Sequence, residues 1–383
     1  MTTKDRVLGL LRKENKGFVS GETMSRELGV TRASINKAIQ ALRNEGYEID
    51  SINNRGYRIV NAPDLLNTAE LSCRLPGERM ERILCLDSVS STNVRLSELA
   101  YEGAEDSFVV IANEQTSGRG RRGRSFASPK DKGIYFSYLM RREEAPADVT
   151  GITAWTAVAV LRAIRKVLGL DSGSSPMKPG SGDSSNAQND TGSDSVRNSQ
   201  TDQRILGIKW VNDLVMNGKK LCGILTEMSI ENETGRIQSI IIGIGVNVNE
   251  EASDFDKNIR DIATSLFLET GKIISRAELA AEMVRQLDEM NRDFPEKKQE
   301  YLEEYRQYSL ILGRTIQVYD ARAMDVNGAG NAAGGVSPVN VKSVLPAPKT
   351  AKAVAINDDF SLKIEEPNGT TSDVSSGEVS VRW

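Results

Sequence analysis

The sequence predicts an α+β protein built from three parts in chain order. Residues 1–62 contain short amphipathic helices and a hairpin pattern, residues 63–312 alternate apolar strands with helices, and residues 313–383 contain only short strands. A chain of 383 residues with 39% hydrophobic content can bury a sizeable core in two or three domains. We therefore expect a small helical domain, a central domain with a mixed sheet, and a small C-terminal β-barrel.

Composition excludes several kinds of chemistry. The chain has no histidine, which rules out Ser-His triads and histidine metal ligands. Cys73, Cys85 and Cys222 lack CxxC spacing, and we expect reduced core residues. Because there is neither a membrane-length apolar run nor a signal-peptide pattern, we expect a cytoplasmic protein without a membrane partner. Catalysis must then depend on lysine, arginine, carboxylates and backbone groups.

The first 62 residues predict three helices followed by two strands. Ser20 and Thr31 are suited to cap the second and third helices, and Gly29 is suited to end the second. The third helix has apolar residues at helical spacing and polar residues on its outer faces. This region holds 11 Lys/Arg against 7 Asp/Glu, a balance of +4, whereas the whole chain stands at −4.

This pattern resembles a winged helix-turn-helix, in which one helix reads base edges in the major groove and the hairpin touches the DNA backbone. The side chains that the resemblance assigns to operator DNA are Arg32, Ser34, Asn36, Lys37 and, at the hairpin tip, Arg55. A helical domain for protein contacts is the alternative, because the charge is modest. One such domain reads a half-site, so a palindromic operator would require a dimer.

A loop of unusual composition lies in the central region. Residues 118–124, GRGRRGR, hold four arginines and three glycines between two predicted strands, 108–112 and 133–139. Glycines let the backbone approach a ligand, and guanidinium groups donate paired hydrogen bonds to carboxylates and phosphates. We interpret the segment as a mobile anion-binding loop; a solvated basic loop is the alternative.

Four further motifs accompany this loop: SVSSTN at 88–93, KWVND at 209–213, KLCGIL at 220–225 and GIGVNVN at 243–249. In this order and spacing the five motifs resemble those of the biotin protein ligases. With the N-terminal region, the chain resembles the bifunctional ligases that also repress transcription. The resemblance covers almost the whole sequence, and GRGRRGR together with KWVND is its most specific part.

The resemblance implies a central domain of the class II synthetase-like type, an SH3-like C-terminal barrel, and a two-step reaction. Biotin and ATP form biotinyl-5′-AMP and pyrophosphate, and biotin then passes to one lysine of a biotin carboxyl carrier domain in a carboxylase. Biotinyl-5′-AMP would also serve as co-repressor. Ligand binding would order the arginine loop and favour a homodimer, and the acceptor protein would compete for the same state.

The resemblance also assigns residues to each substrate. Those assigned to biotin are Ser91, Thr92, Asn93, Gln115, Gly118, Arg119, Gly120, Arg121, Lys209 and Gly223. Those assigned to ATP and the adenylate are Arg121, Arg124, Phe126, Lys209, Asn212, Asp213 and Asn247. Lys209 and Arg121 are the catalytic candidates, because positive charge beside the α-phosphate stabilises the charge that develops there. We expect Mg²⁺ to arrive with ATP near Asp213 and Asn247, and no metal site made by protein alone.

Two positions depart from the usual pattern of these ligases. Phe126 stands where they commonly have a tryptophan that stacks on adenine, and Val211 stands where they commonly have proline. Phenylalanine can stack more weakly, and valine removes a restraint on φ beside Lys209.

Residues 171–203 and 323–350 have the biased composition of disordered insertions. We expect deletion of the first to leave ligation intact. The predicted domains are thus a DNA-binding domain at 1–62, a ligase domain at 63–312 and a C-terminal domain at 313–383, with residues 276–308 helical.

Other functions fit parts of the pattern. A lipoate ligase would share the fold, but its expected signature contains histidine, which this chain lacks. A repressor that senses biotinyl-AMP without catalysis would have no need of Lys209 and four arginines. A ligase whose first domain no longer binds DNA stays open, and operator binding measured against salt would distinguish it.

Overall fold

The computed structural model describes residues 2–14, 17–142, 151–170, 205–231, 235–320 and 348–381. The predicted insertion at 171–203 lies outside the described residues, as does most of the one at 323–350. The predicted end of the second insertion was wrong, because Lys349 and Thr350 begin strand β11 and pair with Val318 and Gln317 of β10. None of the helices in the described ranges is long and apolar enough to cross a membrane.

The N-terminal module is a three-helix unit with a two-stranded antiparallel hairpin. Ser20 Oγ accepts a hydrogen bond from Thr23 N at 3.0 Å, and Thr31 Oγ1 accepts one from Ser34 N at 3.2 Å, so both predicted caps are confirmed. Gly29 ends its helix in the left-handed conformation. The elements are α1 (Thr3–Lys13), α2 (Gly21–Leu28), α3 (Arg32–Asn44), β1 (Glu48–Ile52) and β2 (Gly56–Asn61).

A buried carboxylate joins this module to the central domain. Glu70, on α4 (Thr68–Ser72), is 1% exposed and accepts hydrogen bonds from Tyr47 and, at 2.8 Å, from Arg12 on α1. Burial opposes ionisation, yet these donors hold the pKa of Glu70 below its usual value. Asp64, in the connecting segment, accepts from the fully buried Arg276 at 2.7 Å. The two parts are therefore attached through charged contacts.

The central domain is built on a seven-stranded sheet with the order β3-β4-β5-β9-β8-β7-β6. β3 and β4 run parallel, and the other neighbouring pairs are antiparallel. The arginine loop connects β4 to its partner β5, as predicted. The strands are β3 (Ile83–Leu86), β4 (Val109–Ala112), β5 (Ile134–Met140), β6 (Leu206–Lys209), β7 (Asp213–Met216), β8 (Lys219–Ile230) and β9 (Ile237–Val246).

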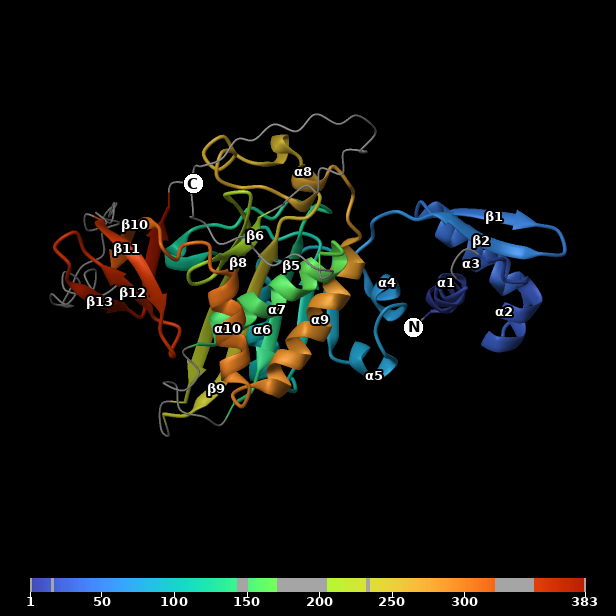
Figure 1. The fold of residues 1–383 in the computed structure, drawn as a ribbon. Coiled ribbons are helices and arrows are strands. Elements are labelled where there is room, and N and C mark those ends of the chain that lie inside the picture. Colours follow the sequence, from blue (N-terminus) through green and yellow to red (C-terminus); the bar gives the residue numbers. More distant parts are fainter. Residues whose placement is uncertain are drawn as a thin grey trace, which may run out of the picture.

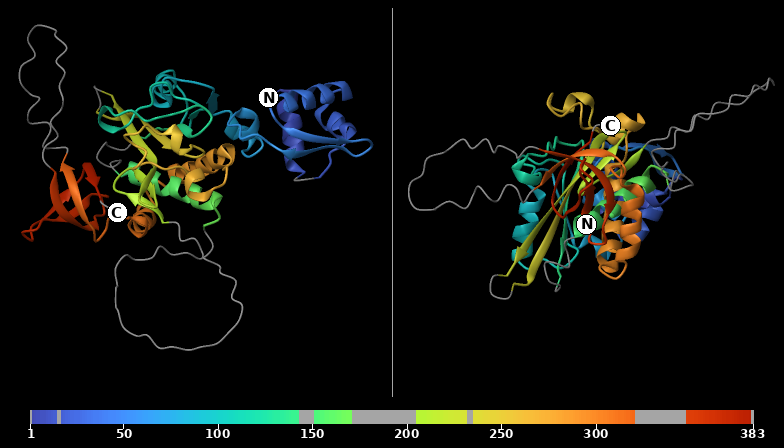
Figure 2. Two further views of the ribbon diagram at one scale, coloured as in Figure 1. Left: turned by 90° about the horizontal axis from the view of Figure 1, so that it is seen from above. Right: turned by 60° about the vertical axis from the view of Figure 1, so that its left-hand side comes forward.

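Helices cover the two faces of this sheet unequally. α6 (Thr92–Tyr101) packs on one face through Leu96, against Val110 and Ile241, while α7 (Ile152–Val167), α9 (Arg276–Asp293) and α10 (Lys298–Tyr308) cover the other (Figure 2). The motif SVSSTN at 88–93 thus ends inside the first turn of α6. Short elements complete the domain: α5 (Gly77–Met80), η1 (Arg121–Gly123), η2 (Ala252–Asp254) and α8 (Leu266–Thr270).

The KWVND motif at 209–213 spans a tight reversal of the chain and not a single strand. Lys209 pairs with Asp213, so the chain reverses between β6 and β7 and residues 210–212 form the turn. Trp210 is buried there, and its Nε1 donates to Phe360 O at 2.9 Å. The Trp210–Val211 peptide bond is cis. A run of apolar residues cannot by itself reveal a reversal as tight as this one.

The C-terminal part is a five-stranded antiparallel sheet with the order β13-β12-β11-β10-β14. β13 and β14 are its edges and no ladder joins them within the described residues, so the predicted closed barrel is not confirmed. Its buried residues belong to the same core as those of the central domain. This sheet and the N-terminal module lie at opposite ends of the central domain (Figure 1). The strands are β10 (Thr315–Asp320), β11 (Lys349–Ile356), β12 (Leu362–Glu365), β13 (Thr371–Val374) and β14 (Gly377–Ser380).

Candidate functional site

The site lies on the face of the central sheet that carries α6. One row of paired residues crosses the sheet there, and partners in a row project to the same face. The row runs Lys209, Asp213, Gly223, Gly245, Tyr135. Gly223 and Gly245, with Gly243 two residues away, form a surface without side chains that we call the glycine floor. A Cβ on Gly245 would lie 2.5 Å from the Phe126 ring, so this aromatic ring rests directly on the floor.

A buried polar cluster occupies one side of the floor. Gln115 Oε1 accepts from Thr92 N at 2.9 Å and from Thr92 Oγ1 at 3.1 Å, and Gln115 Nε2 donates to Ser128 Oγ at 3.0 Å. Ser137 Oγ lies 2.7 Å from Thr92 Oγ1 and 2.6 Å from Asn93 Oδ1. Asn93 sits so close to Gly243 that a Cβ there would be 2.3 Å from Asn93 Oδ1. Neutral donors and acceptors thus converge in a confined space.

The arginine loop lies over the other side, held by contacts from distant strands. Arg119 Nη1 is 3.3 Å from Glu227 Oε1 on β8, and Arg121 Nη1 donates to Asn212 Oδ1 at 2.8 Å. Arg124 makes a bidentate pair with Glu378 of β14, at 2.7 and 2.8 Å. Burial and the neighbouring Arg122 lower the pKa of Arg121. Arg122 Nη1 also lies 3.7 Å from Glu378 Oε2, so all four arginines are aimed by partners that lie far away in sequence.

Two lysines stand around Asp213. Lys220 Nζ donates to Asp213 Oδ1 at 2.7 Å. Lys209, at the end of the row, is half-buried, and burial lowers its pKa; the nearby Asp213 opposes that effect and the positive charge of Lys220 adds to it.

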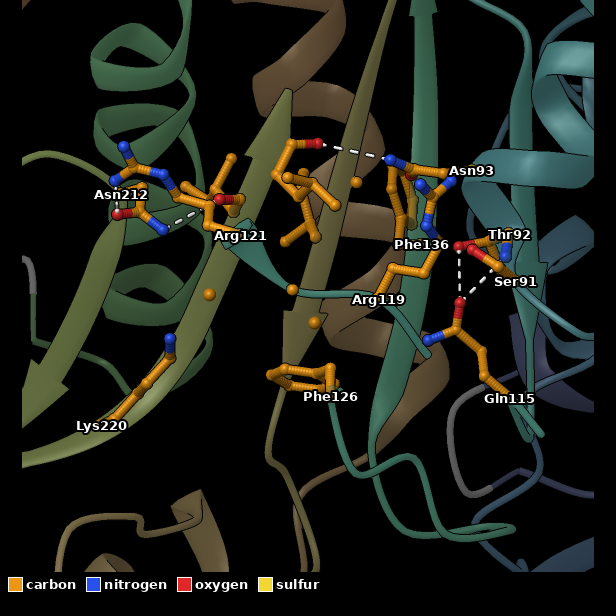
Figure 3. Close-up of a pocket in the computed structure, with 17 residues that line it drawn as sticks. Ser91, Thr92, Asn93, Gln115, Arg119, Arg121, Phe126, Phe136, Asn212 and Lys220 are labelled. Carbon is orange, nitrogen blue, oxygen red and sulfur yellow. Dashed lines mark hydrogen bonds between the residues drawn. The ribbon is translucent and has the colours of Figure 1, made fainter. Parts of the chain in front are cut away.

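Two adjoining cavities share this site. The first contains the polar cluster, Arg119, Phe126 and the floor, and has a free volume of about 50 Å³. That is room for a few water molecules, so a larger ligand must displace lining side chains. The second, of about 110 Å³, is lined by Arg121, Arg122, Arg124 and Lys220 together with Asp213 and Glu378. Figure 3 shows Phe126 between Lys220 and the polar cluster.

The structure brings most predicted site residues together. Ser91, Thr92, Asn93, Gln115, Arg119, Gly120, Arg121, Phe126, Asn212 and Gly223 line the first cavity, and Arg124 and Asp213 line the second. Gly118 lines neither of these two cavities, and its carbonyl oxygen accepts a hydrogen bond from Phe126 N at 2.9 Å. Lys209 and Asn247 line neither cavity; Asn247 is buried and donates to Thr264 O at 2.9 Å.

Ser137, Lys220, Glu227 and Glu378 also belong to this site, and none of them was assigned to a substrate from the sequence. Ser137 had a signal, because it is the one small polar residue among the large aliphatic and aromatic side chains of β5. Glu227 links the two sides, since it also accepts from Asn93 Nδ2 at 2.7 Å. Strand pairing decides the positions of Glu227 and Glu378, and neither stands out in the sequence.

The N-terminal module presents a second polar surface. Arg32, Asn36 and Lys37 are exposed on α3, whereas Ser34 is half-buried in its first turn. Arg32 pairs with the exposed Glu22 at 2.6 Å, and Asn36 accepts a hydrogen bond from Tyr57 of the hairpin. Arg55, the remaining residue predicted to contact DNA, is exposed at the hairpin tip. Its guanidinium carbon lies 4.8 Å from the centre of the Phe18 ring.

Comparison with known proteins agrees with these two surfaces. Residues 85–247 match the biotin/lipoate A/B protein ligase family and residues 4–58 match an HTH domain. The bifunctional ligase/repressor BirA of Bacillus spizizenii is 33% identical over 294 residues, which cover 76% of this chain and 79% of that protein. For BirA of Escherichia coli the identity is 30%, over 71% of this chain and 72% of that protein.

The biotin protein ligase of Aquifex aeolicus, solved in complex with biotin and ATP, shares the fold with a TM-score of 0.54. It is 24% identical, and the match covers 78% of this chain and 98% of that one. Fold, site and matches define the class: a biotin/lipoate-type ligase domain preceded by a helix-turn-helix domain. Within that class, the chain belongs to the family of the bifunctional ligase/repressors.

Proposed function

We propose that the chain is an ATP-dependent biotin protein ligase that also acts as a biotin-responsive repressor. The observation that carries the ligase proposal is the junction of two unlike cavities, one with neutral polar groups over a glycine floor and one rich in cations. The first suits the ureido ring and apolar body of biotin. The second suits phosphates.

In the first step, a carboxylate oxygen of biotin attacks the α-phosphorus of ATP, and the bond to the leaving pyrophosphate breaks. The carboxylate is already ionised at neutral pH, so this step needs no general base. Arg121 and Lys209 stabilise the developing negative charge electrostatically. In the second step, the amine of an acceptor lysine in a biotin carboxyl carrier domain attacks the acyl carbon, AMP leaves, and the amine loses a proton.

Magnesium would come with the nucleotide. Asp213 fits a role as its side-chain oxygen contact, because it faces the second cavity, whereas the Asn247 amide is already engaged with the backbone. When bound, the ion would neutralise phosphate charge. We further propose domain boundaries at 62/63 and 312/313, an SH3-like C-terminal domain, a synthetase-like central domain and a cytoplasmic location.

The test of the ligase is pyrophosphate release from ATP with added biotin. We expect Lys209→Ala to lower the rate by about 10²–10³, as for loss of one electrostatic stabiliser. Lys219→Ala is the control, because this exposed lysine lines neither cavity, and it should keep the wild-type rate. If the wild type releases no pyrophosphate when biotin is added, the protein is a ligand-sensing DNA-binding protein and not a ligase. Release with lipoate instead of biotin would indicate the related lipoate ligases.

For the repressor function, we propose that α3 enters the major groove of operator DNA and that a ligand-induced homodimer pairs two such helices. The exposed Asn36 and Lys37 support this. Asn36→Ala should relax specificity at one base pair. Lys37→Ala should reduce the slope of the logarithm of the binding constant against the logarithm of the salt concentration by about one. Sedimentation with and without biotin and ATP tests the dimer. If the wild type shows no salt-dependent operator binding, the protein is a ligase whose first domain has lost DNA binding.

A further inference from the structure

We propose that Lys220 is a second phosphate-binding lysine of the site, which exchanges Asp213 for the phosphates of ATP when the nucleotide enters. This rests on the proposed ligase function and concerns a residue that the motif resemblance did not assign. The alternative is that the Lys220–Asp213 pair only stabilises the β7–β8 hairpin.

The position of Lys220 is the first argument. The two cavities share five lining residues: Gly120, Arg121, Phe126, Asn212 and Lys220. Lys220 therefore stands with Arg121 at the boundary, which is where the carboxylate of one substrate meets the α-phosphate of the other. Lys209 lines neither cavity. Of these two lysines, Lys220 is the one that lines both cavities, and Figure 3 shows its side chain among the residues of the first.

The backbone is shaped to aim this side chain. Lys220 pairs with Val215 but Cys222 pairs with Leu214, so Leu221 is an extra residue on β8. Such bulges re-aim a side chain and are frequent beside active sites. Here Nζ of Lys220 would lie 3.0 Å from a Cβ on Gly223, so the ammonium extends across the glycine floor.

The peptide groups around Lys220 are held independently of its side chain. Lys220 N donates to Ile262 O at 2.8 Å and Lys220 O accepts from Thr264 N at 2.9 Å. Replacing the side chain should therefore leave the strand in place. This makes the functional and structural roles separable by mutation.

The charges favour an exchange of partners. The second cavity has four cationic side chains against the carboxylates of Asp213 and Glu378, which leaves an excess of positive charge for an anion. The Lys220 side chain is 40% exposed, and ion pairs with that much solvent access are weak. A triphosphate can thus replace Asp213 at small cost, and Asp213 is then free to contact the accompanying magnesium ion.

Calorimetric titration of the full chain with MgATP, and separately with biotin, tests the proposal. Lys220→Met should weaken ATP binding about tenfold or more, as for loss of a charge-assisted hydrogen bond. Biotin binding should weaken much less. Lys220→Arg should restore most of the ATP affinity, because it restores the charge. Lys219→Met removes the same charge from the exposed neighbouring position and should bind ATP as the wild type does.

Unchanged ATP affinity in Lys220→Met would overturn the proposal, as would a wild type that binds no ATP. Equal losses in Lys220→Met and Lys220→Arg, with a lowered urea midpoint in both, would assign the pair a structural role and overturn it too. Binding of ATP that depends on Lys220, without biotin-dependent pyrophosphate release, would support the lysine's role and count against the ligase function alone.

Discussion

The two sides of the site are held together in different ways. On the polar side, Thr92, Asn93 and Ser137 are buried and bonded to one another. On the arginine side, Arg119 and Arg124 are exposed and pair with carboxylates on distant strands. Buried hydrogen bonds are costly to leave unmade, whereas exposed ion pairs contribute little and exchange easily.

This difference indicates how the site works. In the proposed function the polar cluster acts as a preformed recognition surface, since its groups already hold one another in a fixed arrangement. The arginine loop is aimed by partners that a substrate anion can replace. Glu227 contacts both sides through Asn93 and Arg119, so a ligand that displaces Arg119 also changes the surroundings of the polar cluster.

The largest effect should come from filling the floor beneath the polar cluster. Gly243→Ala places a methyl group 2.3 Å from Asn93 Oδ1, so Asn93 must move. We expect a loss of biotin affinity of about a hundredfold or more, with destabilisation of roughly 1–3 kcal/mol from overpacking. Calorimetry and urea unfolding measure both. The control is Gly77→Ala, where a Cβ meets nothing within 4 Å. Retained biotin affinity would show that the cluster is not preformed.

An intermediate effect should come from Glu250, which is buried beside Gly133 at the start of β5. Its carboxylate oxygens have no hydrogen-bond partner among the described residues, and burial, with Asp254 adding to it, raises its pKa to about 7. The folded protein holds the Glu250 proton more tightly than the unfolded chain does. The contribution of Glu250 to the free energy of unfolding is therefore fully present below about pH 4 and is lost as pH rises through about 7. The loss is on the order of 3–4 kcal/mol.

Glu250→Gln should remove this pH dependence and be more stable than the wild type at pH 8. Urea unfolding followed by tryptophan fluorescence from pH 4 to pH 8 measures it. Glu251→Gln, at the exposed neighbouring position, should keep the wild-type slope. If the free energy of unfolding depends on pH in the same way for Glu250→Gln and the wild type, Glu250 does not cause the pH dependence.

The smallest effect should come from the arginine side. Glu378→Gln removes the carboxylate that holds Arg124, a pair with side chains 59% and 32% exposed. An exposed pair contributes about 0.2–1 kcal/mol, so the loop should open about two- to fivefold more often. Its cleavage by trypsin at residues 119–124 should accelerate accordingly. Glu366→Gln, which removes the partner of Lys349 on the same sheet, should have no effect on that rate. A change beyond tenfold would mean that this contact is as costly to lose as those of the buried cluster.

Several features were predictable because they depend on neighbouring residues. The caps at Ser20 and Thr31 follow from side chains that reach backbone amides three residues ahead. The arginine loop was placed between two strands by the apolar runs on either side. The motif resemblance identified Thr92, Gln115 and Gly223, which the structure brings to one cavity.

Other features could not be predicted from the sequence because they depend on strand register. The bulge that aims Lys220, and the pairing that carries Glu227 beneath Arg119, change with a shift of one residue. Asn247 was assigned to the nucleotide by its motif, yet its amide is bonded to the backbone of Thr264. A motif specifies residue types but not which face of a sheet each one reaches.

The sequence by itself determined the kinds of chemistry available: a chain without histidine, four arginines among glycines, a polar cluster ahead of a helix, and a basic helix-hairpin unit. Only the tertiary structure decided which of two lysines faces the cavities, which carboxylates hold the loop, and that a strand from the C-terminal sheet completes the second cavity. The physical reason is that composition and local spacing act within a few residues. Charge partners and cavity walls are instead set by contacts between segments as far apart in the sequence as residues 124 and 378.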